Sequence, residues 1–136
     1  MMTKKFNCIL LIDDDEATNY IHRKVIEEVD CAEKVVIAQS GQEALDFLNG
    51  KENDPNSPID LIFLDINMPA MNGWEFLEHY KNLDSSKKAK GVLIMLSTSL
   101  NPDDHGNASK IDVVDGFQTK PLTEEKMIRI HKNHFS

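Results

Sequence analysis

Residues 61–69 read LIFLDINMP. The first four of them form an unbroken apolar run, Asp65 follows directly, and Pro69 comes four residues after Asp65. A strand that is covered on both faces has no solvent-facing side, so its residues are apolar throughout instead of alternating with polar ones. The stretch therefore predicts a buried strand of a parallel sheet over residues 61–64, with Asp65 at its carboxyl end. Ligands of open parallel sheets bind beyond the carboxyl ends of the strands, so Asp65 marks the edge where we expect a functional site.

Four similar apolar runs occur elsewhere in the chain, and segments of helical character separate all five. The apolar runs predict further strands over residues 8–12, 35–38, 92–96 and 114–118. Apolar residues at helical spacing predict helices over residues 15–29, 41–48, 73–83, 103–113 and 123–134. Because strands and helices alternate and parallel crossovers are right-handed, the pattern predicts an α/β fold with an open, doubly wound, five-stranded parallel sheet.

Capping residues mark the starts of several predicted helices. Asp15 is expected to be the N-cap of the first helix, and Ser40 that of the second, with Glu43 as its capping-box partner. The first helix is expected to turn one apolar face inward, and the residues of that face are Ala17, Ile21, Val25, Ile26 and Val29.

The composition is that of one folded cytoplasmic domain. The 136 residues are too few for two ordinary domains, and the 40% of hydrophobic residues suffices for a core. A formal net charge of -8 disfavours nucleic acid and anionic membranes as partners. No early apolar run is long enough for a signal peptide or a membrane span. We therefore expect residues 1–136 to form a single domain, with Cys8 and Cys31 as free thiols.

Chemically active side chains follow four of the five predicted strands. Asp13 and Asp14 come after the first strand, Asp65 after the third, Ser97 after the fourth and Lys120 after the fifth. The carboxyl ends of parallel strands meet at one edge of the sheet, so these side chains are expected to converge. Crowded carboxylates repel one another, and Mg²⁺ relieves that repulsion because it prefers oxygen ligands.

Each acid is expected to take a different part in holding the ion. We expect Asp14 and Asp65 to bind Mg²⁺ directly and Asp13 to bind it through water. The backbone carbonyl of Asn67, two residues after Asp65, is expected to complete the coordination shell.

The remaining two side chains suit a phosphoryl group. The ammonium of Lys120 can pair with Asp65 or with a phosphoryl oxygen, and the hydroxyl of Ser97 can donate to the same oxygen. With Mg²⁺, they would stabilise a phosphoryl group during its transfer to a carboxylate.

These motifs together resemble the response regulator receiver (CheY-like) family of two-component signalling. The similar segments are Ile12-Asp13-Asp14, residues 63–69, Met71-Asn72-Gly73, Ser97 and Lys120-Pro121. The resemblance extends over about residues 7–131 and implies a flavodoxin-like fold with strand order 2-1-3-4-5. Residues 61–69, 72–77 and 99–104 look like a single-domain subgroup, of which some members partner phytochrome-type or hybrid sensor kinases.

The resemblance also implies a role for each site residue. Asp65 matches the phosphoacceptor, Lys120 the lysine that contacts the phosphoryl group, and Ser97 the switch hydroxyl. Phe117 falls at the aromatic switch position, although it fits simple packing equally well. The family implies a cis peptide bond before Pro121. Asp13 and Asp14 match its acidic, magnesium-binding pair.

As a member of such a family, the chain is expected to be a phosphorylation switch and not an enzyme acting on other substrates. Its phosphodonor would be a sensor histidine kinase or a phosphotransfer protein. We expect no DNA-binding or catalytic domain after residue 136, so output would pass through an unidentified target protein, and a homodimer stays open.

Two other functions are weighed against this one. A phosphohydrolase of the haloacid dehalogenase type also forms an aspartyl phosphate, but it needs a second acid where this chain has Asn67. A pseudo-receiver would bind partners without accepting phosphate, which the intact set of site residues disfavours.

Overall fold

The architecture was determined from a computed structural model, which describes residues 4–51, 53–54, 56–89, 91–98, 106 and 113–135. The strands are β1 (Phe6–Ile12), β2 (Ala32–Ala38), β3 (Ile59–Asp65), β4 (Val92–Ser97) and β5 (Gly116–Thr119). The helices are α1 (Glu16–Val29), α2 (Gly41–Asn49), α3 (Gly73–Lys81) and α5 (Glu124–Phe135), with a short 3₁₀ helix at Ser85–Lys87. The helix predicted over residues 103–113 lies outside the described residues, apart from Gly106 and Val113.

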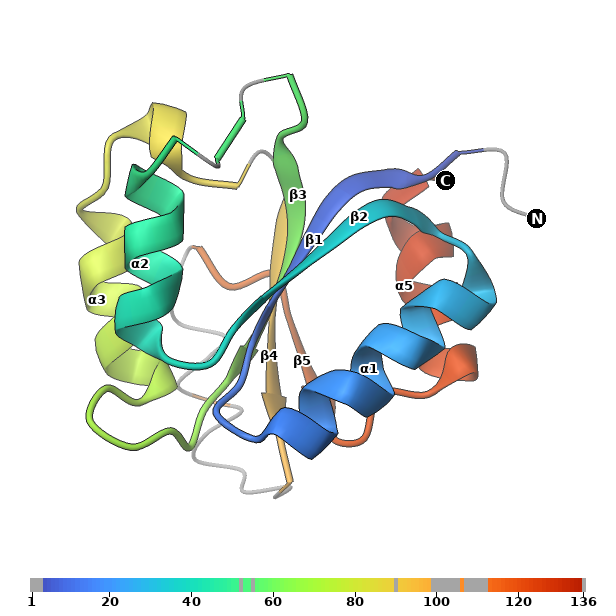
Figure 1. The fold of residues 1–136 in the computed structure, drawn as a ribbon. Helices are drawn as coiled ribbons and strands as arrows, with labels where there is room; N and C mark the ends of the chain where they lie inside the picture. The colour runs from blue at the N-terminus through green and yellow to red at the C-terminus, as the bar shows by residue number, and fades with distance from the viewer. Residues whose placement is uncertain are drawn as a thin grey trace.

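All five strands pair in parallel in the order β2-β1-β3-β4-β5. The predicted α/β fold and its strand order 2-1-3-4-5 are therefore confirmed. Helices α1 and α5 cover one face of the sheet, and α2 and α3 cover the other (Figure 1). The carboxyl ends of the strands point to the lower edge of that view, and the beginning of β1 and the end of α5 lie near the opposite edge.

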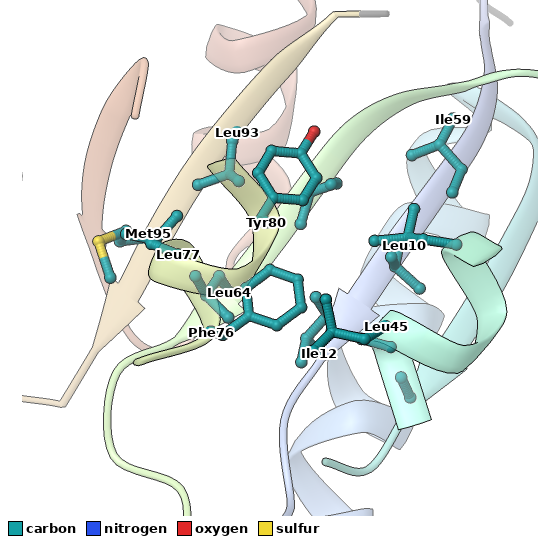
Figure 2. Packing of buried hydrophobic residues seen from close by; sticks show 14 of the residues in the cluster. Leu10, Ile12, Leu45, Ile59, Leu64, Phe76, Leu77, Tyr80, Leu93 and Met95 are labelled. Carbon is teal, nitrogen blue, oxygen red and sulfur yellow. The ribbon is translucent and has the colours of Figure 1, made fainter. Parts of the chain in front are cut away.

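Two apolar cores, one on each face, explain why the middles of the three central strands β1, β3 and β4 are apolar. On one face, alternate residues such as Leu10, Leu64 and Met95 pack against Phe76 and Leu77 of α3 (Figure 2). The intervening strand residues face the other way and pack against the inner sides of α1 and α5. Both cores bury nearly all of their side chains, so a polar side chain in the middle of β1, β3 or β4 would lack a partner.

Two aspartate side chains bind backbone N–H groups near the amino ends of the strands. The carboxylate of Asp60 accepts hydrogen bonds from the N–H groups of Asn7 and Cys8, at 2.8 and 3.2 Å, where the pairing of β1 with β3 shifts by one residue. The carboxylate of Asp115 accepts the N–H of Leu93 at 2.8 Å, so β5 begins one residue later, at Gly116. The strand predicted over residues 114–118 is thus displaced to Gly116–Thr119.

The predicted N-caps Asp15 and Ser40 are present, but the reciprocal bond that would make Glu43 a capping-box partner is not among the described contacts, and the buried face of α1 differs from the prediction. Asp15 caps α1 and accepts the N–H of Ala17, and Ser40 caps α2 and accepts the N–H of Glu43. Ala17 and Ile21, both expected to be buried, are exposed, and Ile21 is 50% exposed. The buried residues of α1 are Asn19, His22 and Ile26.

The position of α1 explains why polar side chains, and not the expected apolar ones, are buried in its first turns. The helix begins at the edge where the strands end, so its first turns pack against polar groups of that edge, whereas its later turns pack against the apolar core. The inward positions of the first turns are accordingly polar.

Two further expectations concern the thiols and the membrane. Cys8 and Cys31 are both buried and free, as predicted. In the described part of the chain, every helix is too short or too polar to cross a bilayer.

Gly73 brings α3 against the carboxyl end of β3. Its N–H donates to the carbonyl of Ile66 at 2.8 Å, and a Cβ at this position would lie 2.7 Å from the carbonyl oxygen of Asp65. Those neighbours are backbone atoms, which cannot swing aside as a side chain can.

We therefore expect Gly73→Ala to lower the free energy of unfolding by about 1–3 kcal/mol, the usual cost of overpacking. Urea denaturation monitored by circular dichroism would measure it. Gly106→Ala is the matched control, because Gly106 is helical and a Cβ there would meet no atom of the other described residues within 4 Å. Equal effects of the two substitutions would contradict the close approach.

Candidate functional site

Three acids meet at the carboxyl ends of β1 and β3. Asp13 and Asp14 directly follow β1, and Asp65 is the last residue of β3. One carboxylate oxygen from each lies within 4.8 Å of the other two. Asp13 and Asp65 are each only 4% exposed, whereas Asp14 faces solvent. The expected convergence of these acids is therefore present in the structure.

Lys120 reaches the same place from the end of β5. Its Nζ atom lies 2.5 Å from Oδ2 of Asp13 and 3.0 Å from Oδ1 of Asp65. One ammonium thus bridges two buried carboxylates that come from different strands. Among the described residues, three carboxylates stand against this one ammonium, so the cluster keeps an excess of negative charge.

Backbone hydrogen bonds fix the acids in place. The N–H of Asp13 donates to the carbonyl of Ala38 at 3.1 Å, and its Oδ1 accepts the N–H of Asp15 at 2.9 Å. The N–H of Asn67 donates to Oδ1 of Asp65 at 3.4 Å, which places Asn67 immediately beside the phosphoacceptor candidate.

Ser97 and Phe117 lie on adjoining strands beside the cluster. Ser97 is fully buried at the end of β4, and its carbonyl accepts the N–H of Lys120 at 2.7 Å. Phe117 pairs in register with Met95, two residues before Ser97. Because residues two apart in a strand share a face, Ser97 and Phe117 lie on the same face of the sheet. Phe117 is half-buried and packs against the core beneath α2 and α3.

The turn that carries Lys120 is held by two side chains that the sequence did not single out. The peptide bond between Lys120 and Pro121 is cis, as the family resemblance implied. His22 accepts the N–H of Leu122 through Nε2 at 3.2 Å. Lys126 donates to the carbonyls of Thr119 and Pro121, at 2.8 and 3.1 Å.

The sequence contained a signal for the buried position of His22. Asn19, His22 and Ile26 have the i, i+3, i+7 spacing of one helix face, so two polar residues share the face of a core isoleucine. Lys126 carried no comparable signal, because a lysine in the first turns of a helix is ordinary.

Burial and charge shift the pKa values of the site. Burial raises the pKa of Asp65 above its ordinary value, the hydrogen bond from Lys120 opposes this, and the charge of Asp13 adds to it. Burial lowers the pKa of Lys120, but its hydrogen bonds to Asp13 and Asp65 outweigh that effect and leave the pKa raised. Burial lowers the pKa of His22 to about 4.

The donor set fits a hard divalent cation. Carboxylate oxygens are the ligands that Mg²⁺ prefers, and Asp13, Asp14 and Asp65 present three of them within 4.8 Å. The excess negative charge of the cluster is what such an ion would offset. The exposed Asp14 leaves one side of the cluster open to solvent.

Comparisons with known proteins agree with this geometry. The family model described as "Response regulator receiver domain" matches residues 9–132. Two-component response regulator 24 of Arabidopsis thaliana is 31% identical over 127 residues, which are 93% of this chain and 83% of that protein. Two-component response regulator ORR1 of Oryza sativa is 28% identical over 91% of this chain, a match that spans only 53% of the rice protein.

A solved structure is similar over nearly the whole length. The crystal structure of a two-component response regulator from Cytophaga hutchinsonii has a TM-score of 0.87 and 32% sequence identity. The match covers 97% of this chain and 98% of that one.

The raised pKa of Asp65 predicts that its charge destabilises the fold. A carboxyl whose pKa is raised by folding adds stability below its unfolded pKa and loses it as the pH rises through the folded value. Asp65→Asn should therefore raise the free energy of unfolding at neutral pH without divalent cations. Urea denaturation in EDTA measures this free energy. Glu28→Gln is the control, because it removes the same charge from an exposed side chain of α1. An Asp65→Asn protein no more stable than the control would contradict this prediction.

The lowered pKa of His22 predicts loss of stability in acid. The stability from neutral His22 is fully present above pH 6.5 and is lost as the pH falls towards about 4. By linkage the loss is on the order of 3 kcal/mol. Asp13, Lys120 and Lys126 are the charges that act on the imidazole.

The non-titrating variant His22→Gln isolates this effect. Urea denaturation of both proteins between pH 7 and pH 4 should show that the wild type loses on the order of 3 kcal/mol more than His22→Gln as the pH falls. Parallel curves over that range would show that His22 does not titrate in this way.

Proposed function

The chain belongs to the response regulator receiver family of two-component signalling, and we propose that it is switched by magnesium-dependent transfer of a phosphoryl group to Asp65. The observation that carries this proposal is the bridge from Lys120 to Asp13 and Asp65 within a cluster of three acids. Residues 1–136 act as one receiver domain in this proposal.

Asp65 is the nucleophile. Its carboxylate oxygen attacks the phosphorus of a phosphohistidine, and the bond from phosphorus to the imidazole nitrogen breaks. The electron pair stays on that nitrogen, which takes a proton from solvent. Water can later attack the acyl phosphate and regenerate the free carboxylate.

Charge stabilisation makes this transfer favourable. A Mg²⁺ ion held by Asp13, Asp14 and Asp65, with the backbone carbonyl of Asn67, would offset the negative charge of the phosphoryl oxygens. Lys120 gives up its contact with Asp65 and donates to a phosphoryl oxygen instead, while Asp13 keeps its ammonium close by.

Ser97 and Phe117 report the event to the surface. Ser97 moves towards the phosphoryl group and donates its hydroxyl hydrogen to it. Phe117, on the same face of the neighbouring strand, then moves into the space that Ser97 has vacated. The shift needs only a coupling of about 1–3 kcal/mol between two existing conformations.

The partners follow from this chemistry. A sensor histidine kinase or a phosphotransfer protein supplies the phosphoryl group, and a target protein, or a second copy of the chain, reads the altered surface. Within this role the domain catalyses only its own phosphorylation and dephosphorylation. The acidic surface suits protein partners better than nucleic acid.

Phosphate incorporation from acetyl phosphate tests the proposal. With Mg²⁺ the wild type should gain one phosphoryl group, detected by mass spectrometry, and both Asp65→Asn and excess EDTA should abolish it. Lys120→Ala should slow incorporation by about tenfold or more, since a preorganised charge is lost. Lys132→Ala is the control, because Lys132 is an exposed lysine of α5, and it should not change the rate.

Other results would point elsewhere. A wild type that gains no phosphate and does not bind beryllofluoride would be a pseudo-receiver. Repeated turnover of phosphate esters would instead indicate a phosphohydrolase of the haloacid dehalogenase type.

A further inference from the structure

Lys120 stands at the start of a turn with little regular structure of its own. Residues 120–123 link β5 to α5 outside any helix or strand. The N–H of Lys120 is bonded to Ser97, but Pro121 has no N–H to offer. The next backbone donor of the turn is therefore the N–H of Leu122, whose partner is His22 of α1.

His22 is built into the protein as a hydrogen-bond acceptor. Its side chain is 2% exposed, and Nε2 lies 3.2 Å from the nitrogen of Leu122. A ring nitrogen can accept only when it carries no proton, so the imidazole is neutral with its proton on Nδ1. A histidine buried only for packing would not need this bond, since an apolar side chain would fill the space equally well.

The same face of α1 also holds the other end of the ion pair. Asn19 lies one helical turn before His22, is 2% exposed, and donates through Nδ2 to the carbonyl of Asp13 at 2.8 Å. Residues three apart on a helix are separated by a fixed rise of about 4.5 Å. One rigid face thus connects the backbone of Asp13 with that of Leu122, two residues after Lys120.

We propose that His22 is a positioning residue for Lys120: it ties the turn 120–123 to α1, so that the ammonium is held against Asp13 and Asp65. The consequence for phosphoryl transfer rests on the proposed function, whereas the positioning itself does not. Lys126 holds the same turn through the carbonyls of Thr119 and Pro121, so removal of His22 loosens it only in part.

Competitive lysine acetylation measures the positioning directly. In the wild type, Lys120 should react with acetic anhydride more slowly than exposed Lys24, because its ammonium is paired and largely buried. His22→Leu should speed the acetylation of Lys120 relative to Lys24 by about three- to tenfold, the factor that corresponds to one ordinary hydrogen bond. His22→Gln, whose side-chain oxygen can accept the N–H of Leu122, should stay within about twofold of the wild type.

A control separates positioning from a general loss of stability. Ile26→Ala removes a buried side chain one turn further along the same face of α1 without touching the turn. It should destabilise the protein and leave the acetylation of Lys120 unchanged. If His22→Leu does not fold, His22→Met provides the same comparison with a more adaptable apolar side chain.

Phosphorylation kinetics test whether His22 acts through Lys120. His22→Leu should slow incorporation from acetyl phosphate by about three- to tenfold in the wild type, again the size of one hydrogen bond. In a Lys120→Ala background it should have no further effect, because the group it positions is gone. Multiplied effects of the two substitutions would overturn the proposal, as would unchanged acetylation of Lys120 in His22→Leu.

The two proposals fail in different ways. Faster acetylation of Lys120 in His22→Leu, in a protein that accepts no phosphate, would support the positioning and contradict the proposed function. Normal phosphorylation of the wild type, with unchanged acetylation of Lys120 in His22→Leu, would support the proposed function and contradict the positioning.

Discussion

The bridge from the ammonium of Lys120 to the carboxylates of Asp13 and Asp65 is the interaction around which the functional edge is arranged. Buried charges are costly unless they are paired and hydrogen-bonded, and each member of this group is both. Its members come from the ends of three different strands, so the bridge exists only when the sheet has its full order. Because three carboxylates of the described residues face this one ammonium, the cluster keeps an excess of negative charge, which a cation would offset.

The three central strands β1, β3 and β4 deliver Asp13, Asp14, Asp65 and Ser97 at their ends because their middles are apolar. Two cores, one under α2 and α3 and the other under α1 and α5, bury both faces of the sheet and leave no place for polar side chains until the strands end. At the opposite edge, Asp60 binds the N–H groups of Asn7 and Cys8 where the register of β1 and β3 shifts, and Asp115 binds the N–H of Leu93 just before β5 begins.

Sequence patterns were most reliable where a local physical rule applies. The caps at Asp15 and Ser40 were predicted because a side-chain oxygen satisfies nearby N–H groups, which is a purely local interaction. The inward face of α1 was predicted wrongly at Ala17 and Ile21, since hydrophobic spacing assumes an apolar neighbour. The first turns of α1 instead meet Asp13 and the turn after Lys120, and there Asn19 and His22 are the residues that fit.

The sequence by itself determined the strand and helix alternation, the edge at which the site lies, and the identity of the acids, lysine and serine that stand there. These follow from apolar runs that end in polar residues, a pattern that is complete within a few positions of the chain. The tertiary structure alone decided that Lys120 bridges Asp13 and Asp65, and that Asn19, His22 and Lys126 support the bridge. Those contacts join residues up to 107 positions apart, and their distances depend on how helices pack on the sheet, which no local pattern encodes.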